Sequence, residues 1–599
     1  MQSDRLELVS LAGLAAFVLS LAIVIARPPA DGYEISLYDA YPAYFWALIV
    51  AALSAGAVIL VASTWNRTDR VWMEGVGLLV LTNGLLTLLP YLRGYRLYGR
   101  ADALSHLGYV RNIVSSGDIG GNIYSPMHVL VLAVAEAAGA QPMAVAMLLT
   151  AVLSGIYFGG MFYLMVYLFE DRERVLFGLP FVMLPVLGHA HVGFRPFDWS
   201  LMLIPIVLYL FTKSQQDPRP EVRAPFVISL VAILLYHPLT GLFTIVIFAI
   251  YLLVRYAPQI TQQYATSTNV LSLSAMVFLV WYSSFAGIVF RFQRIYQTLF
   301  GVSQDQAPAD AYVDAINQAQ PPLQQTVRVV TFKYGIEAVL FALGFAFIGL
   351  CLLLIFRGRY SPGIATALLL PAFLLFSLGG LLFLTMDLIV PHDRPFQIAK
   401  IGGTVLAGQL CYLLWNNIDF TQWSTDVQTP FRISVVSVLL VLALLSTFSL
   451  YPSPLATETN HQVTAMELEG SNWLMKHGNE TNELVEFKLE YKRFYHARHG
   501  VETAKPFQGQ RPPSHFNYTE RPSFGQSYTT DQYLTVNRLG RIVYPRNFAN
   551  YPEHWQFRPA DFEQLRRDRT VAHVYDNGEY DQYLVDGTAE DSRPISEPE

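Results

Sequence analysis

One short stretch of the chain combines side chains that can bind a phosphate and move a proton. It contains Arg100, Asp102, His106, Arg111 and Tyr124. In a helix that begins near Asp102, the i, i+4 spacing places Asp102 and His106 on one face, with Arg100 just before them. A positioned carboxylate or imidazole can accept a proton, and a guanidinium donates two parallel hydrogen bonds to a phosphate. The residue types and their spacing therefore predict a catalytic or phosphate-binding cluster.

The same residues also allow a purely structural interpretation. Aspartate is a favoured residue at the N-cap of a helix, so Asp102 could cap the helix while His106 lies exposed on its surface. The sequence supports the two interpretations equally.

Three arginines farther along the chain are further candidates for phosphate contact. Arg394 lies in the segment VPHDRPF beside His392, and Arg291 and Arg294 begin a long amphipathic outer loop, 291–335. Such a loop could close over a site. The alternative for each arginine is an interfacial position, from which its side chain reaches lipid headgroups. This alternative is favoured for Arg291 and Arg294, whereas a functional role is favoured for Arg394.

A His-x-His element, Gly188-His189-Ala190-His191, precedes Arg195 and Asp198. Two imidazoles and a carboxylate could bind a metal ion. Nothing in the sequence fixes their geometry, however, and a polar loop is the favoured interpretation. We therefore assign no metal site from the sequence.

The composition indicates which elements must hold these residues. The 599 residues are 53% hydrophobic and 14% charged, whereas soluble domains carry about 25% charged residues. A soluble or disordered protein is excluded, and the net charge of −6 excludes a protein that coats nucleic acid. Charge is unevenly distributed, because the residues after Tyr451 hold 22 of the 46 acidic and 16 of the 40 basic residues. We therefore predict a mainly α, multispanning membrane domain, 1–451, followed by a small soluble α/β domain, 452–599.

Apolar runs of about 20 residues predict membrane-spanning helices. The chain has thirteen candidate runs: 6–26, 43–63, 71–92, 143–169, 175–194, 199–212, 224–236, 239–254, 270–290, 336–356, 364–384, 398–415 and 433–451. The run 126–139 is too short to span and carries Glu136, so we expect a helix that lies at the membrane surface or enters and leaves the membrane on the same side. In the C-terminal domain we expect a helix at 561–568 and a hairpin at 571–585 around Asn577-Gly578.

The distribution of Lys and Arg predicts the orientation of the chain in the membrane. With the N-terminus in the cytoplasm, the inner loops are basic, as expected, and thirteen spans place the C-terminal domain outside the cell. The outer loops hold as many basic residues, however, concentrated at 93–111, 291–333 and 394–400. Either this orientation is wrong, or these outer loops need positive charge, as they would around a phosphate. In the second case, 93–142 is the expected outer catalytic loop.

Several features of this region resemble the GT-C superfamily of membrane glycosyltransferases. They are an acidic residue in an early outer loop (Asp102), an amphipathic segment at 106–114, a Tyr-Ser-Pro element at 124–126, and the surface helix that follows. The resemblance implies an inverting transfer of a sugar from a polyprenyl-phosphate donor to a glycan, protein or lipid acceptor at the outer face of the cell membrane. It implies that Asp102 is the general base. The lipid phosphate would be held by the surrounding polar groups: Arg100, His106, Arg111, Tyr124, Arg291, Arg294, His392 and Arg394.

The sequence also departs from this family. The paired acids of the GT-C loop are absent, since Ala103 and Leu104 follow Asp102, and the acidic loop follows the third span and not the first. The tail has no Trp-Trp-Asp-Tyr-Gly motif, which argues against an oligosaccharyltransferase catalytic subunit. A bound divalent metal is left without support, and we assign no cofactor. The segment 32–46 is similar to archaeal multispanning proteins, which implies an archaeal membrane.

Two other functions stay open. A transporter, or a flippase of lipid-linked oligosaccharides, requires repeated halves with broken helices and acidic residues at mid-membrane, whereas the acids here cluster at the outer edges. A non-catalytic membrane scaffold whose tail binds partners predicts that substitution of Asp102 or Arg394 has no effect.

Overall fold

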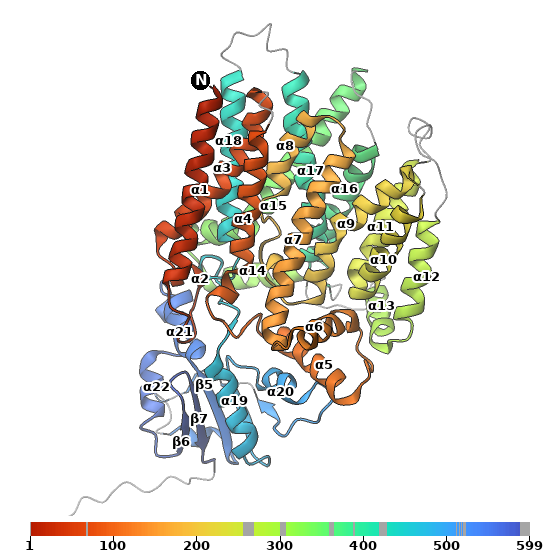
Figure 1. The fold of residues 1–599 in the computed structure, drawn as a ribbon. Coiled ribbons are helices and arrows are strands. Elements are labelled where there is room, and N and C mark those ends of the chain that lie inside the picture. Colours follow the sequence, from red (N-terminus) through yellow and green to blue (C-terminus); the bar gives the residue numbers. More distant parts are fainter. Residues whose placement is uncertain are drawn as a thin grey trace, which may run out of the picture.

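The computed structural model describes residues 2–66, 70–217, 219–255, 269–299, 307–358, 364–386, 390–417, 428–510, 512–513, 515–516, 518 and 523–587. These residues form a bundle of long helices with a small α/β unit at one end (Figure 1). The N-terminus lies at the opposite end, and we call the end beside the α/β unit the sheet end. The predicted fold class, a mainly helical membrane protein with a small α/β part at the C-terminus, is confirmed.

Each of the thirteen predicted apolar runs overlaps a helix of the bundle. These helices are α1 (Gln2–Ala26), α3 (Ala43–Asn66), α4 (Val71–Leu92), α7 (Pro142–Leu168), α8 (Arg172–Val182), α9 (Pro196–Gln216), α10 (Pro220–Tyr236), α11 (Pro238–Arg255), α12 (Val270–Tyr282), α15 (Leu323–Phe356), α16 (Ile364–Thr385), α17 (Asp393–Asn417) and α18 (Gln428–Phe448). The count of thirteen spans is not confirmed: among the described residues, nine helices are long and apolar enough to cross a membrane, and the bent pair of α12 and α13 (Ala286–Leu299) would add a tenth. The helices α8, α10 and α11 are too short to qualify. The chain is therefore a multi-pass membrane protein.

The prediction of one continuous helix over 175–194 is wrong. α8 has 11 residues, which is about 16 Å of helix, against a hydrocarbon core of about 30 Å. Pro185 follows it closely, and a proline cannot donate the backbone hydrogen bond that would continue a helix. The chain instead passes through a short 3₁₀ helix, η1 (Gly188–His191), before α9 begins at Pro196.

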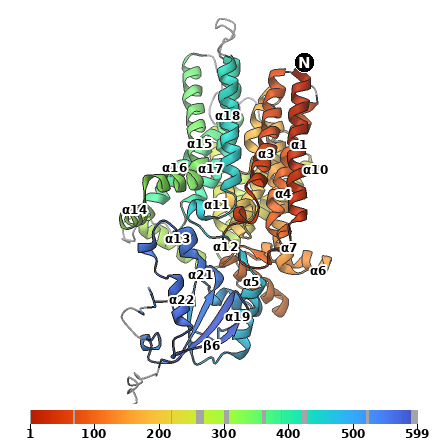
Figure 2. The same cartoon turned by 90° about the vertical axis from the view of Figure 1, so that its left-hand side faces the viewer.

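Five shorter helices lie at the sheet end (Figure 1, Figure 2). They are α2 (Leu37–Ala40), α5 (Asp102–Ser116), α6 (Ser125–Ala138), α13 and α14 (Pro308–Ala319). α6 matches the predicted surface helix and has 14 residues. Pro126 suits its first turn, and Gly139, with a φ of +61°, ends it in the left-handed conformation that favours glycine.

The α/β unit is a five-stranded sheet with helices on both sides. The strand order is β4-β3-β5-β7-β6; β3 runs parallel to β4 and β5, and β7 runs antiparallel to β5 and β6. Its elements are α19 (Ala465–His477), β3 (Glu483–Phe487), α20 (Tyr491–His499), β4 (Gly509–Gln510), β5 (Gln532–Asn537), α21 (Arg538–Asn547), α22 (Pro559–Leu565), β6 (Val571–Asp576) and β7 (Tyr580–Val585). The β6–β7 hairpin and α22 confirm the two elements predicted there.

The α/β unit is joined to the membrane body by contacts far apart in the sequence. β1 (Leu97–Tyr98) pairs antiparallel with β2 (Gln462–Val463). Tyr33 and Ile35, from the segment after α1, are buried in the core of the sheet, and α20 packs against α5. The C-terminal unit therefore helps to position the loop that carries Asp102.

Candidate active site

α5 begins at Asp102, after two residues with unusual backbone conformations. Gly99 has a φ of +124° and Ala101 a φ of +54°, and glycine adopts positive φ without the steric cost that other residues meet. A non-glycine residue held in a sparsely populated conformation costs about 1–3 kcal/mol. Contacts with the surrounding structure must therefore stabilise this turn. Arg100, which lies between Gly99 and Ala101, makes such contacts.

Arg100 anchors the turn to the α/β unit. Its Nη2 donates to Oε1 of Glu467 on α19 at 2.6 Å, and its Nη1 donates to the carbonyl oxygen of Gln462 at 2.6 Å. Both charges are buried, since 14% of the Arg100 side chain and 1% of the Glu467 side chain are exposed. The guanidinium predicted to hold a lipid phosphate thus has an anionic partner within the chain, and it fixes the loop.

Asp102 faces the α/β unit. Arg493, on α20, places Nη2 2.9 Å from Oδ1 of Asp102, and its Nη1 donates to Ser105 Oγ at 3.0 Å. The Asp102 side chain nevertheless stays 63% exposed, so its carboxylate is held in place and open to a second molecule. Gly108 allows α20 to come this close, because a Cβ at residue 108 would lie 2.6 Å from the carbonyl oxygen of His496.

Two buried histidines form a hydrogen-bonded chain with Asn122. The Tyr124 backbone N–H donates to Asn122 Oδ1 at 3.0 Å, which turns the Asn122 Nδ2 toward Nδ1 of His128, 2.7 Å away. Since Nδ2 is a donor, His128 must carry its proton on Nε2, which donates to Nδ1 of His106 at 3.1 Å. His106 consequently presents a protonated Nε2.

Burial keeps His106 and His128 in their neutral form. It lowers the pKa of His106 to about 4 and the pKa of His128 well below its usual value. Both are therefore neutral at pH 7. The structural interpretation that placed His106 exposed on the surface is wrong, because His106 is buried.

A second charged pair lies at the start of α9. Arg195 donates through Nε to Oδ2 of Asp198 at 2.7 Å and also contacts His189. Gly193 leaves room for this carboxylate, since a Cβ there would collide with it. The two histidines of the His-x-His element do not converge on one point, because His189 faces the Arg195 guanidinium and His191 hydrogen-bonds a serine of α7.

Tyr124 connects the histidine chain to the far wall of the site. Its ring stacks on His237, with the centroids 5.5 Å apart, and meets the His106 ring edge to face at 5.7 Å. Arg394, in the first turn of α17, lies over the Phe197 ring at 4.9 Å. The Phe197 ring in turn meets the His237 ring edge to face at 5.4 Å, so one ring separates this guanidinium from the stacked pair. Burial, followed by the charge of Arg394, lowers the pKa of His237.

The other predicted site residues occupy separate positions. Arg111 is exposed on α5. Arg291 is exposed on α13, and its charge also lowers the pKa of His237, whereas Arg294 is half-buried on the same helix. The ring of His392 packs edge to face against Tyr312 of α14 at 6.0 Å.

The residues linked by these contacts form what we call the sheet-end cluster: Asp102, His106, Tyr124, Arg195, Asp198, His237, Arg394 and Arg493. It combines one exposed carboxylate with guanidiniums from α17, α20 and the start of α9. The charges of Asp102, Arg493 and Arg195 all act on the buried His106. Such a cluster can accept a proton and attract an anionic ligand in one place.

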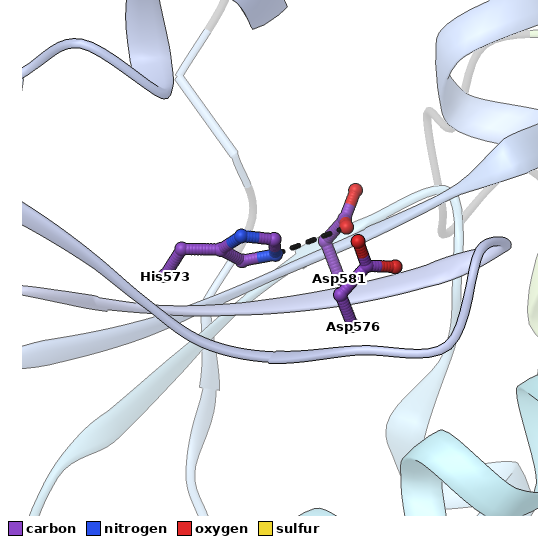
Figure 3. A group of neighbouring side chains, drawn as sticks. All are labelled: His573, Asp576 and Asp581. Carbon is purple, nitrogen blue, oxygen red and sulfur yellow. Dashed lines mark hydrogen bonds and ion pairs between the residues drawn. The ribbon is translucent and has the colours of Figure 1, made fainter.

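A group of three potential metal ligands occurs in the α/β unit, well apart in sequence from Asp102. His573, Asp576 and Asp581, on the β6–β7 hairpin, bring their ligand atoms within 4.8 Å of one another (Figure 3). Asp581 is fully buried and pairs with Arg541. A metal ion would have to compete with this guanidinium, so we interpret the group as an ion-pair network within the sheet.

Sequence reasoning missed three residues of the site. No local sequence pattern indicates a role for Arg493, because its hydrogen-bond partner Ser105 lies 388 residues earlier in the chain. Asn122 and His128 lie on either side of the Tyr-Ser-Pro element, and their spacing of six residues matches no simple helical face. The turn before α6 is what brings them together.

No family model matches the chain, and no curated protein matches it. Among solved structures, the chain is similar to an Archaeoglobus fulgidus oligosaccharyltransferase tethered to an acceptor peptide, with 11% identity and a TM-score of 0.42 over 92% of this chain and 75% of that chain. It is also similar to ArnT from Cupriavidus metallidurans bound to undecaprenyl phosphate, with 12% identity and a TM-score of 0.45 over 86% of this chain and 98% of that one. At these identities and TM-scores, the likeness assigns neither a family nor an activity to this chain.

Proposed function

We propose that this chain is an inverting glycosyltransferase of the GT-C type. It moves a sugar from a polyprenyl-phosphate donor to a glycan, protein or lipid acceptor at the outer face of the cell membrane. The observation that carries the proposal is the exposed carboxylate of Asp102 among guanidiniums at one end of a membrane bundle. A carboxylate can take the proton of a hydroxyl, and guanidiniums bind phosphate well.

The proposed chemistry begins at Asp102. Its carboxylate accepts the proton of an acceptor hydroxyl while the hydroxyl oxygen attacks the anomeric carbon of the sugar. The bond between this carbon and the phosphate oxygen breaks on the opposite face, so the configuration at the carbon inverts. The lipid phosphate leaves with the bonding electron pair, and fixed cations that face its growing negative charge lower the barrier.

Arg394 is the guanidinium best placed for the leaving phosphate. It stands in the first turn of the membrane-spanning α17, where a lipid chain could continue along the helix into the bilayer. Arg195 is nearby, but Asp198 already neutralises it. The neutral His106 has a protonated Nε2 that can donate to an oxygen of the donor or the acceptor.

The proposed orientation follows from the same site. A cytoplasmic N-terminus places the sheet end, and with it Asp102, outside the cell, because the two lie at opposite ends of the bundle (Figure 1). The basic inner loops support this orientation.

The experiment that tests the function compares two variants of the purified full chain, supplied with a polyprenyl-phosphate sugar and an acceptor glycan. Asp102→Asn removes the base and should lower kcat by about 10²–10⁴-fold, the usual contribution of general base catalysis. Glu490→Gln is the matched control, since Glu490 pairs with the same Arg493 at the same 2.9 Å. This control should keep its rate within about twofold, because an exposed ion pair contributes little.

Each outcome has one meaning. Full transfer by Asp102→Asn would refute the role of Asp102 as the base. Equal losses in both variants would show that the position of Arg493, and not the Asp102 carboxylate, limits the rate.

A further inference from the structure

A cavity lies at the sheet end, bounded by α2, α15, α18 and α21. Its volume is about 560 Å³, within the range of about 300–1,000 Å³ that small-molecule sites occupy. Aromatic rings of Tyr41, Trp46 and Phe448 form one side, and Arg328 and Arg546 contribute positive charge. None of its lining residues belongs to the sheet-end cluster, so it is a separate site.

The cavity spans the level at which a membrane meets water. Trp46 lies in the first turn of α3 and Phe448 ends α18, at the edge of two membrane-spanning helices. α15 has 34 residues, about 51 Å of helix, which exceeds the hydrocarbon core of about 30 Å by several turns. Arg328 lies in the second turn of α15, and Arg546 belongs to the α/β unit. The cavity therefore has an aromatic floor at the bilayer edge and guanidiniums on its polar side.

Several polar atoms in the lining are buried without a partner. In the described part of the chain, no hydrogen bond reaches Gln325 Oε1, Arg328 Nε, Ser453 Oγ or Asn547 Oδ1. More than about 90% of buried polar groups in proteins have a partner, either protein or ordered water, so a molecule that fills this cavity would have four free polar atoms to pair with. A guanidinium nitrogen requires an acceptor, and amide oxygens require donors.

On the aromatic side of the cavity, the polar atoms have hydrogen-bond partners. The Tyr38 hydroxyl donates to the carbonyl oxygen of Thr447 at 2.7 Å, and Trp46 Nε1 donates to the carbonyl oxygen of Tyr38 at 3.0 Å. Their polar atoms are thus already paired within the chain. The lining also holds one acidic residue, Asp39, and two arginines against one carboxylate favour a single phosphate over a polyanion.

We propose that this cavity binds the headgroup of an anionic phospholipid that carries one phosphate and free hydroxyls. Arg328 and Arg546 contact the phosphate, and Gln325 and Asn547 accept hydrogen bonds from the hydroxyls. The aromatic side faces the start of the acyl chains. Such a lipid would hold the α/β unit on the membrane surface, and the proposal is independent of glycosyl transfer.

The test measures lipid binding by native mass spectrometry of the detergent-solubilised full chain. The probes are phosphatidylglycerol and phosphatidylcholine with identical acyl chains, and glycerol 1-phosphate as the soluble source of the same headgroup chemistry. We expect phosphatidylglycerol to bind at least tenfold more tightly than either of the others. The double variant Arg328→Gln/Arg546→Gln should lose this preference, whereas the control Arg567→Gln/Arg569→Gln, with both arginines exposed on the α/β unit, should keep it.

Three results would overturn the proposal. Equal affinity of the double variant and the native chain for phosphatidylglycerol would exclude the cavity as the site. Equal affinity of glycerol 1-phosphate and phosphatidylglycerol would exclude a membrane lipid as the ligand. Should the double variant fail to fold, the single variant Arg546→Gln decides, because Arg546 is exposed, and an unchanged preference in that variant would overturn the proposal as well.

Discussion

Replacement of Glu467 by alanine should release the loop that positions Asp102. Glu467 accepts hydrogen bonds from Arg100, from the Thr464 backbone N–H and from Asn537 Nδ2. It is 1% exposed, and its partner Arg100 is 14% exposed. The alanine variant would leave the Arg100 charge buried without its carboxylate, beside the strained Ala101 turn.

The size of the effect follows from this burial. Removing one partner of a buried ion pair costs about 3–5 kcal/mol. At about 1.36 kcal/mol for each factor of ten, the opened population of the loop should rise about 150- to 5,000-fold. Trypsin cuts after Arg100 only when the loop opens, and cleavage follows the open population when reclosing is faster than cutting. The rate of cleavage after Arg100 should therefore rise by the same factor, which mass spectrometry of the fragments can measure.

Two comparisons make this measurement specific. The Asp217–Arg219 pair has the same 2.6 Å separation, but its arginine side chain is 72% exposed, so Asp217→Asn should leave cleavage after Arg100 unchanged. The double variant Arg100→Met/Glu467→Leu lacks both charges, so its Tm should be close to that of the native chain. A rise of less than about tenfold in Glu467→Ala, or equal melting of the single and double variants, would refute the reasoning.

Two further predictions concern the histidine chain. Asn122→Asp should reverse the direction of the hydrogen bonds in this chain. A carboxylate at residue 122 accepts a proton from His128 Nδ1, so His128 Nε2 becomes an acceptor and His106 must donate from Nδ1. ¹⁵N NMR of the histidines would detect the change, and an unchanged His106 tautomer would contradict the prediction. Acidification from pH 7 to pH 5 should destabilise the native chain, because the pKa of His106 is lowered from 6.5 to about 4 by folding, so the unfolded state binds more protons in this window. The expected slope is up to about 1.4 kcal/mol per pH unit, and equal slopes for the native chain and His106→Gln in thermal unfolding would argue against it.

The parts of the fold that the sequence predicted well depend on local composition. A run of apolar residues such as 71–92 satisfies its own backbone as a helix, so its length alone predicts a span. Asn577-Gly578 likewise specifies the tight turn between β6 and β7. The run 175–194 misled the prediction because hydropathy counts apolar residues, whereas Pro185 ends the helical hydrogen bonding near the middle of the run.

The sequence predicted the candidate site only where the residues that meet are close together in the chain. The i, i+4 spacing correctly brought Asp102 and His106 onto one helix, α5. The partners of the neighbouring residues were not predictable, because Glu467 lies 367 residues after Arg100 and Arg493 comes from the α/β unit. Only the pairing of β1 with β2 and the packing of α20 on α5 bring those charges together.

These long-range pairs also change the meaning of the basic residues at the sheet end. Four cations of the predicted outer clusters have carboxylate partners within the chain: Arg93 pairs with Glu34, Arg100 with Glu467, Lys333 with Glu458, and Lys400 with Glu337. Each of these pairs joins segments distant in sequence, so part of the apparent excess of positive charge serves to hold loops and helices together. A count of basic residues therefore overstates the charge available to a phosphate. The phosphate hypothesis depends mainly on Arg394, the member of the sheet-end cluster whose guanidinium lies over the Phe197 ring.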